Sequence, residues 1–237
     1  MKKLNFLVLI PTYNEAKIID KVILDVKKEF KDTDILLVDA YSKDNTAEIA
    51  KQHNVNIIFV DKYFGISLAI ESGLLCAWKE DYDFCIRIDG DGQHFPKDVK
   101  KNLDYAIKNK IDLMIGSRFL GTSDYKTNNI RMIGINLLRS VLNRFYKVDI
   151  TDCTSGCQIF SRRLIKAMVG DKNFEYSEIG AICKSSYLSY SIKEKPINMQ
   201  PRKTGKSSFN FINSFNYMFK NLLTLIVSIY LGFKNKL

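Results

Sequence analysis

Two aspartates one residue apart, in the segment Asp89-Gly90-Asp91-Gly92-Gln93-His94, are the residues of this chain best suited to chemistry. They follow an apolar segment, residues 82–88, that is typical of a buried strand. Ligands of open α/β sheets bind beyond the carboxyl ends of the strands, so we expect both carboxylates at a ligand site. Paired hard oxygen atoms suit Mg²⁺ or Mn²⁺, with the remaining coordination positions left for substrate phosphates. The simpler alternative is an Asp-Gly turn between two elements.

Strand and helix patterns alternate through the first half of the chain, and these elements must position the two aspartates. Apolar runs predict strands over residues 4–10, 34–39, 56–60, 83–89 and 112–116. Helical spacing predicts helices over residues 15–30, 42–52, 66–78 and 96–108. Further helices are expected over residues 130–147 and 174–187, and further strands over residues 157–160 and 191–197. The alternation implies an α/β fold with a mostly parallel sheet flanked by helices.

Two other strand ends carry polar residues that would meet the aspartates at one edge of such a sheet. The first strand runs into Pro11-Thr12-Tyr13-Asn14-Glu15, and the second ends at Asp39. Acids gathered at strand ends are costly unless they meet a metal or a hydrogen-bond donor. A nucleobase supplies N–H donors that Asp39 could accept. For Ser42 and Asp44, which follow Asp39, we favour a role as caps of the next helix.

Composition indicates one large domain, or one domain with an appendage. The chain has 237 residues, 46% of them hydrophobic, which is enough to bury a core without disulfides. Its five cysteines are odd in number and scattered, as expected for reduced thiols in a cytosolic compartment. Cys153 and Cys157 lack the second pair of ligands that a structural zinc site needs. The amino-terminal residues show no secretory signal pattern, so we expect a cytoplasmic protein.

The carboxyl-terminal part of the chain carries most of the positive charge. The net charge is +10, and residues 193–237 contain eight Lys or Arg and one Glu. Residues 209–233 are rich in Phe, Tyr, Leu and Ile, but their longest charge-free run, 221–233, is too short to span a bilayer. We therefore divide the chain into a catalytic domain, residues 1–208, and a basic amphipathic helical segment, residues 209–237, that lies on an anionic membrane surface. A helix that packs back onto the domain is the alternative. The acids at the strand ends argue against nucleic-acid binding.

Several segments, in this order, resemble the family-two glycosyltransferases over roughly residues 5–208. They are Pro11-Thr12-Tyr13-Asn14-Glu15, Val38-Asp39 with Asp44-Asn45-Thr46, residues 89–94, Gly116-Ser117-Arg118-Phe119 and Thr154-Ser155-Gly156-Cys157-Gln158. The resemblance implies the glycosyltransferase-A fold, which binds nucleotide sugars. It is strongest to the subgroup that transfers sugars to polyprenyl phosphates. The chain departs from the family at Ala40, where a second acid is common, so the identity of the nucleotide base is not determined. It departs again just before residue 66, where only Gly65 matches the family's glycine pattern, so the identity of the sugar is not determined either.

The resemblance also implies roles for individual residues. The metal would be held by Asp89, Asp91 and Gln93, and Asp91 would thereby be catalytic. The nucleotide sugar would be bound by Pro11, Tyr13, Glu15, Asp39, Asp89 and Gly90. The segment 201–209 resembles a phosphate-facing loop, in which Arg202 and Lys206 would neutralise the departing diphosphate. An acceptor phosphate would be held by Arg118 and Arg131, unless these are solvated surface charges.

Glu178 resembles a family acid near the acceptor, and would serve as a general base if the acceptor were a hydroxyl; the alternative is a surface helix acid. Together these residues predict an inverting, metal-dependent hexosyltransferase, peripheral on the inner face of the cell membrane. It would move a hexose from a nucleoside-diphosphate sugar to a polyprenyl phosphate. Two alternatives remain: transfer to a hydroxyl acceptor in envelope polysaccharide or glycolipid synthesis, and a non-catalytic nucleotide-sugar-binding module.

Overall fold

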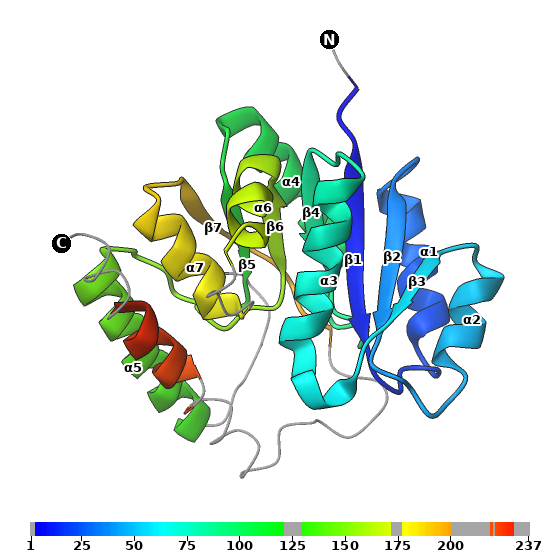
Figure 1. Cartoon of the computed structure of the whole chain (residues 1–237), viewed down its shortest axis with the longest axis horizontal. Coiled ribbons are helices and arrows are strands. Elements are labelled where there is room, and N and C mark those ends of the chain that lie inside the picture. Colours follow the sequence, from blue (N-terminus) through cyan, green and yellow to red (C-terminus); the bar gives the residue numbers. More distant parts are fainter. Residues whose placement is uncertain (1–2, 121–128, 172–176, 201–218, 220, 230–237) are drawn as a thin grey trace.

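The computed structural model describes residues 3–120, 129–171, 177–200, 219 and 221–229. Its centre is a seven-stranded sheet in the order β3-β2-β1-β4-β6-β5-β7 (Figure 1). Neighbouring strands are parallel except at β6, which is antiparallel to both β4 and β5. The predicted α/β sheet is therefore confirmed, with one reversed strand. The strands are β1 (Phe6–Thr12), β2 (Asp34–Asp39), β3 (Asn56–Phe59), β4 (Phe84–Arg87), β5 (Leu113–Ser117), β6 (Gln158–Ser161) and β7 (Ile192–Pro196).

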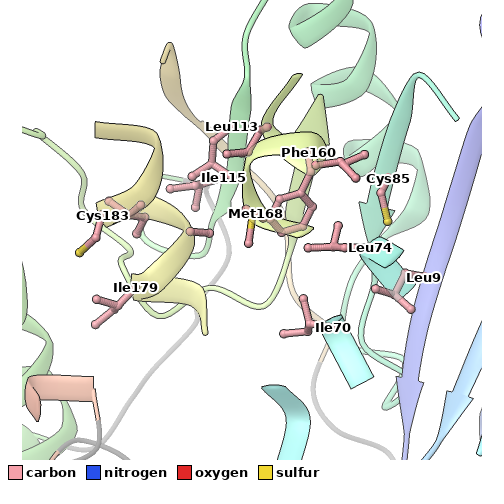
Figure 2. Packing of buried hydrophobic residues seen from close by; sticks show 14 of the residues in the cluster. Leu9, Ile70, Leu74, Cys85, Leu113, Ile115, Phe160, Met168, Ile179 and Cys183 are labelled. Atoms are coloured by element: carbon pink, nitrogen blue, oxygen red, sulfur yellow. The ribbon is translucent and has the colours of Figure 1, made fainter. Parts of the chain in front are cut away.

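Helices cover both faces of this sheet (Figure 1). The α-helices are α1 (Ile19–Glu29), α2 (Thr46–Gln52), α3 (Gly65–Lys79), α4 (Pro96–Asn109), α5 (Asn129–Tyr146), α6 (Arg162–Val169) and α7 (Glu178–Tyr187), with a short 3-10 helix at Lys62–Phe64. Alternate residues of β1 face opposite cores, because successive side chains of a strand point to opposite sides. Leu9 belongs to a cluster that includes residues of α3, α6 and α7 (Figure 2), whereas Val8 belongs to one that includes residues of α1 and α4. Sequence patterns had not predicted α6.

Two predicted helices begin later than expected because their first residues make loop contacts at the sheet edge. The predicted helix 15–30 begins at Ile19, and the predicted helix 42–52 begins at Thr46. Ser42 does not cap α2: its hydroxyl donates to Asp39 and accepts from the backbone N–H of Asn14. Asp44 does serve the first turn, since its carboxylate accepts from the backbone N–H of Thr46 at 3.1 Å. Ser42 and Asp44 thus connect the loop that follows β2 to the loop that follows β1.

A short helix near the carboxyl end, residues 221–229, packs against the domain through one side. Leu225 is fully buried and belongs to the same cluster as Ile135 and Leu138 of α5. Figure 1 shows this helix beside α5. Its other side leaves Leu223 and Ile226 about half exposed. Residues 221–229 therefore pack on the domain and also leave an apolar side exposed. Among the helices described, none combines the length and apolarity needed to cross a bilayer.

Candidate active site

The loop after β4 brings Asp89 and Asp91 to the edge of the sheet where β1 and β2 also end. Its backbone runs on beside β1, since the N–H of Gly90 donates to the carbonyl of Pro11 at 3.3 Å. A Cβ at position 90 would lie 2.5 Å from the Thr12 side chain, so this approach requires glycine. Gly92 has φ +72°, a conformation that other residues rarely adopt. The glycines thus turn the loop tightly enough to place both carboxylates at one edge.

The predicted metal ligands form a small oxygen-rich set. Both carboxylates are partly exposed, and Asp91 Oδ1 accepts from the backbone N–H of Gln93 at 3.1 Å. The side-chain amide of Gln93 donates to the carbonyl of Gln200 at 3.2 Å. No group of three or more His, Cys, Asp or Glu able to hold a metal occurs in the part of the chain that the structure describes. Two carboxylates and one amide oxygen are hard ligands that supply only part of a cation's coordination, so a cation held here would take its other ligands from substrate oxygens and water.

A buried arginine stands directly behind Asp89. Arg87 Nε lies 3.2 Å from Asp89 Oδ1, and Arg87 Nη1 lies 2.8 Å from Glu178 Oε1. The side chains of Arg87 and Glu178 are only 2% and 5% exposed. Burial by itself raises the pKa of the Asp89 carboxyl, but the charges of Arg87 and Arg118 and the hydrogen bond from Arg87 outweigh burial and lower that pKa below its usual value. Asp89 is therefore ionised at neutral pH and available to a cation.

Arg87 was not singled out from the sequence, and a surface position was kept as an alternative for Glu178. The structure rules out the surface-acid alternative, because Glu178 lies buried at the first turn of α7. A signal for Arg87 was present: a charged residue inside the apolar strand segment Cys85-Ile86-Arg87-Ile88 must be paired when it is buried. The sequence could not say with which acids, since Glu178 is ninety-one residues away.

The nucleotide side of the site is built where β1 and β2 end as paired neighbours. Thr12 and Asp39 are partners in the register of the two strands. Asp39 is buried, and its carboxylate accepts from the Thr12 hydroxyl at 3.3 Å and from the backbone N–H of Ser42 at 3.0 Å. Tyr41 follows with φ +52° and stacks on Phe59, with ring centroids 5.7 Å apart. An acid and exposed aromatic rings thus lie together at this corner of the sheet.

Four hydrogen bonds fasten the loop after β1 to the loop after β2. The backbone N–H groups of Asn14, Glu15 and Ala16 donate to the side chains of Ser42, Thr46 and Asp44, respectively. In return, the side chain of Asn14 accepts from the backbone N–H of Lys43 at 2.7 Å. Tyr13 stays partly exposed beside this junction. Pro11, Tyr13, Glu15, Asp39 and Gly90, all predicted nucleotide-binding residues, therefore lie around one edge, while their contacts with a nucleotide stay a prediction.

Arg118 lies in a buried ion pair. Its backbone N–H and its guanidinium both donate to Asp152, with Nη2 2.6 Å from Asp152 Oδ1, and Nη2 also donates to the Thr154 hydroxyl at 2.9 Å. These bonds hold the turn 152–156, whose Gly156 comes so close to Asp89 that a Cβ there would lie 2.3 Å from Asp89 Oδ2. The predicted role of Arg118 at an acceptor phosphate stays a prediction; in this structure Arg118 anchors the turn that supports Asp89.

Replacing Gly156 by alanine should reduce turnover at least about tenfold, because the added methyl group must push the Asp89 carboxylate out of place. Turnover and thermal unfolding of the variant would be measured together. Gly170→Ala is the control, because its Cβ would meet only the Lys166 carbonyl, at 3.3 Å, and no atom of Asp89. Equal turnover in Gly156→Ala and the wild type would mean that contact with Asp89 is unimportant.

The remaining predicted residues are placed only in part. Arg131 lies half-buried on α5. Arg202 and Lys206 lie outside the described residues, as does most of the predicted segment 209–237. The described residues before this gap end at Gln200, whose backbone N–H donates to the carbonyl of Gln93 at 2.8 Å. The predicted metal ligands and nucleotide-binding residues, together with Glu178, are therefore the predicted residues that the structure brings to one region.

A polar sheet edge of this kind on a mixed α/β sheet is typical of nucleotide-binding transferases. The family model described as glycosyl transferase family 2 matches residues 7–169. The chain belongs to this family and is a glycosyltransferase.

Two relatives with assigned activities match most of this chain. It is 30% identical over 214 residues to the UDP-N-acetylglucosamine–dolichyl-phosphate N-acetylglucosaminyltransferase of Methanococcus voltae, covering 80% of this chain and 83% of that protein. It is 26% identical over 225 residues to the polyprenol monophosphomannose synthase of Mycolicibacterium smegmatis, covering 90% and 84%. An uncharacterised protein of Methanocaldococcus jannaschii is 30% identical over 227 residues, covering 92% and 91%.

Solved structures share the fold at low sequence identity. The glucosyl-3-phosphoglycerate synthase of Mycobacterium tuberculosis matches with a TM-score of 0.73 and 16% identity, covering 95% of this chain and 81% of that chain. The same enzyme in complex with Mn²⁺, UDP and glucosyl-3-phosphoglycerate matches with a TM-score of 0.71 and 15% identity, covering 95% and 80%. These matches confirm the glycosyltransferase-A fold that the sequence predicted.

Proposed function

We propose that this glycosyltransferase moves a hexose from a nucleoside-diphosphate sugar to a polyprenyl phosphate, with inversion at the anomeric carbon. The convergence of Asp39, Asp89 and Asp91 at one sheet edge carries the proposal, since it suits a nucleotide at one end and a cation-bound diphosphate at the other. Two relatives whose names specify dolichyl-phosphate or polyprenol acceptors support the lipid acceptor. The Mn²⁺ and UDP in the structural neighbour support a divalent cation, Mg²⁺ or Mn²⁺.

The residues at the sheet edge where β1, β2 and β4 end have different roles in this proposal. Asp39 accepts hydrogen bonds from the base, while Pro11, Tyr13 and Glu15 line its pocket. Asp89, Asp91 and Gln93 hold the cation, which supplies positive charge to the diphosphate oxygens when it is bound. Gly90 carries no side chain that would keep the diphosphate away from the loop.

The reaction itself is a single displacement. An oxygen of the acceptor phosphate attacks the anomeric carbon from the face opposite the diphosphate, the new C–O bond forms, and the bond to the departing diphosphate breaks. A phosphate acceptor is already anionic, so no general base is required. Arg202 and Lys206, which follow Gln200 closely in sequence, would oppose the charge that develops on the departing group. Arg118 and Arg131 would hold the acceptor phosphate.

The lipid acceptor requires the enzyme to work at a membrane, and one side of the molecule suits an anionic lipid surface. Ile133 and Leu137, four residues apart on α5, are 69% and 53% exposed, and Leu223 of the helix 221–229 is 51% exposed. α5 carries three arginines and no acid, and residues 193–237 carry eight basic residues and one acid. Apolar side chains combined with basic ones are typical of helices that lie in the interface of anionic membranes.

The double variant Leu137→Glu, Leu223→Glu should bind vesicles of anionic phospholipid at least about tenfold more weakly than the wild type. Burying the exposed halves of both leucines contributes about 1.5–3 kcal/mol in total, and about 1.4 kcal/mol corresponds to a tenfold change in affinity. Co-sedimentation with vesicles measures the bound fraction. Leu24→Glu is the matched control, since Leu24 is equally exposed but lies on α1, on the other side of the sheet. Equal binding of the double variant and the control would contradict the membrane assignment.

The function is tested by a radiolabelled transfer assay. Membranes containing the protein are offered UDP-glucose, UDP-N-acetylglucosamine or GDP-mannose together with polyprenyl phosphate, with and without Mn²⁺. We expect a lipid-linked product that is labile to mild acid and disappears when the metal is chelated. A product on a glycan acceptor alone would move the assignment to polysaccharide or glycolipid synthesis. Donor binding without turnover on any acceptor would indicate a binding module.

A further inference from the structure

Arg87 is a buried cation that the proposed reaction does not use. It lies at the end of β4, immediately beneath the loop that carries Asp89 and Asp91. Its side chain is among the largest that the described core encloses completely. A buried charge is tolerated only where counter-charges and hydrogen bonds compensate it. Arg87 has such partners on two sides, Asp89 in the metal loop and Glu178 on α7.

The fold fixes the position of Glu178 relative to β4. Ser177 caps α7 by accepting from the backbone N–H of Gly180 at 3.1 Å. Gln158 pairs with Arg87 in the register of β4 and β6, and its side-chain amide donates to the carbonyl of Glu178 at 3.3 Å. The first turn of a helix also favours a carboxylate. The strand that carries Arg87 and the helix that carries Glu178 are therefore held together at this point.

The three side chains form a row of alternating charge with one net negative charge. If Glu178 were uncharged, the guanidinium of Arg87 would interact more strongly with Asp89 and would compete with a divalent cation for that carboxylate. With Glu178 sharing the guanidinium, Asp89 is held by one Arg87 Nε–H bond and keeps its charge for the cation. Groups that orient a metal ligand in this way commonly change metal affinity by about 10- to 100-fold.

We propose that Arg87 and Glu178 are positioning residues for the metal ligand Asp89, and that Glu178 acts through Arg87 rather than as a proton acceptor for the sugar acceptor. This rests on the proposed metal-dependent transfer. The geometry is unsuited to a base, because the Glu178 side chain is 95% enclosed and one of its carboxylate oxygens is bonded to the guanidinium of Arg87.

Mn²⁺ binding to the purified full-length protein with UDP, and without acceptor, tests the proposal. Free Mn²⁺ is followed by electron paramagnetic resonance for the wild type, Glu178→Gln, Arg87→Gln and the double variant, and thermal unfolding checks each fold. We expect Glu178→Gln to raise the Mn²⁺ Kd at least about tenfold. Saturating Mn²⁺ should restore most of its kcat. The double variant should bind Mn²⁺ no more weakly than Arg87→Gln, since Glu178 acts only through Arg87.

Two further variants keep the experiment decisive. Glu178→Asp retains the charge and should recover part of the Mn²⁺ affinity, even where Arg87→Gln does not fold. Asp112→Asn is the matched control: Asp112 is also buried and lies 3.6 Å from Arg163, but it precedes β5 at the opposite edge of the sheet. It should leave the Mn²⁺ Kd unchanged.

An unchanged Mn²⁺ Kd in Glu178→Gln, with a kcat that saturating metal does not restore, would overturn the proposal and make Glu178 a direct participant. A wild type that binds no Mn²⁺ would overturn it too. Missing lipid product alongside the expected shift in Mn²⁺ Kd would refute the polyprenyl-phosphate acceptor and leave the positioning role intact.

Discussion

Asp89→Ala should abolish measurable sugar transfer, with a loss of at least about 1,000-fold, while the protein remains folded. The variant removes a carboxylate that holds the cation at the departing diphosphate. Removing one preorganised electrostatic group from the developing charge alone costs about 10²- to 10³-fold in kcat, and here the cation would be weakened as well. The fold should survive, because Arg87 keeps Glu178 as a counter-charge when Asp89 is absent.

The assay is transfer from labelled donor at several Mn²⁺ concentrations, with circular dichroism to confirm the fold. Asp104→Ala is the control, since Asp104 is an exposed acid on α4 whose partner is Lys100 of the same helix. It should keep wild-type turnover. Undiminished transfer by folded Asp89→Ala would exclude Asp89 as a metal ligand, and the loop after β4 would then be only a turn.

Much of the fold could be predicted because its signals are local. Apolar runs that end at Pro, Asp or Gly predicted β1 to β5 close to their observed bounds, and Pro96 marked the start of α4. The reversed direction of β6 has no such signal, since strand direction depends on connections and pairing across the sheet. α6 is eight residues long, and it follows β6 directly with Ser161 as its cap. Eight residues make only about two helical turns, which is too short a stretch for helical periodicity to predict.

In the candidate site too, some residues could be predicted from local sequence patterns and others could not. Asp89, Asp91 and Asp39 could be predicted because each follows an apolar strand in the sequence. What surrounds them could not, because it depends on residues distant in the chain: Glu178 reaches Arg87 across ninety-one positions, and Asp152 reaches Arg118 across thirty-four. Polar pairs between distant segments leave no periodic trace. The sequence predicts the groups that would meet a ligand, and the structure adds the buried charges that hold them.

The second large effect concerns stability, and it arises at the ion pair of Arg118 with Asp152. Asp152 is completely buried and accepts from the backbone N–H, Nε and Nη2 of Arg118. Asp152→Ala would leave the guanidinium, 8% exposed, without this carboxylate. Removing one partner of a buried pair costs about 3–5 kcal/mol. We therefore expect the free energy of unfolding, measured in urea, to fall by about that amount.

Arg139→Ala provides the contrast, because Arg139 lies 3.8 Å from Asp149 in an exposed pair. Its loss should change the free energy of unfolding by less than about 1 kcal/mol. If Asp152→Ala cost no more than this control, Arg118 would not depend on Asp152 for its place in the core. Its charge would then be available to an acceptor phosphate, as the sequence predicted.

Arg118→Lys separates the two roles of Arg118 because lysine keeps the charge but loses the planar fork that meets Asp152 at two nitrogens. If Arg118 mainly anchors the turn 152–156, the variant should lose stability and kcat together, as the support beside Asp89 loosens. If Arg118 mainly holds the acceptor, the KM for polyprenyl phosphate should rise while the free energy of unfolding stays nearly constant. The three bonds to Asp152 favour the first outcome, since a guanidinium already bonded on two sides has few donors left for a lipid phosphate.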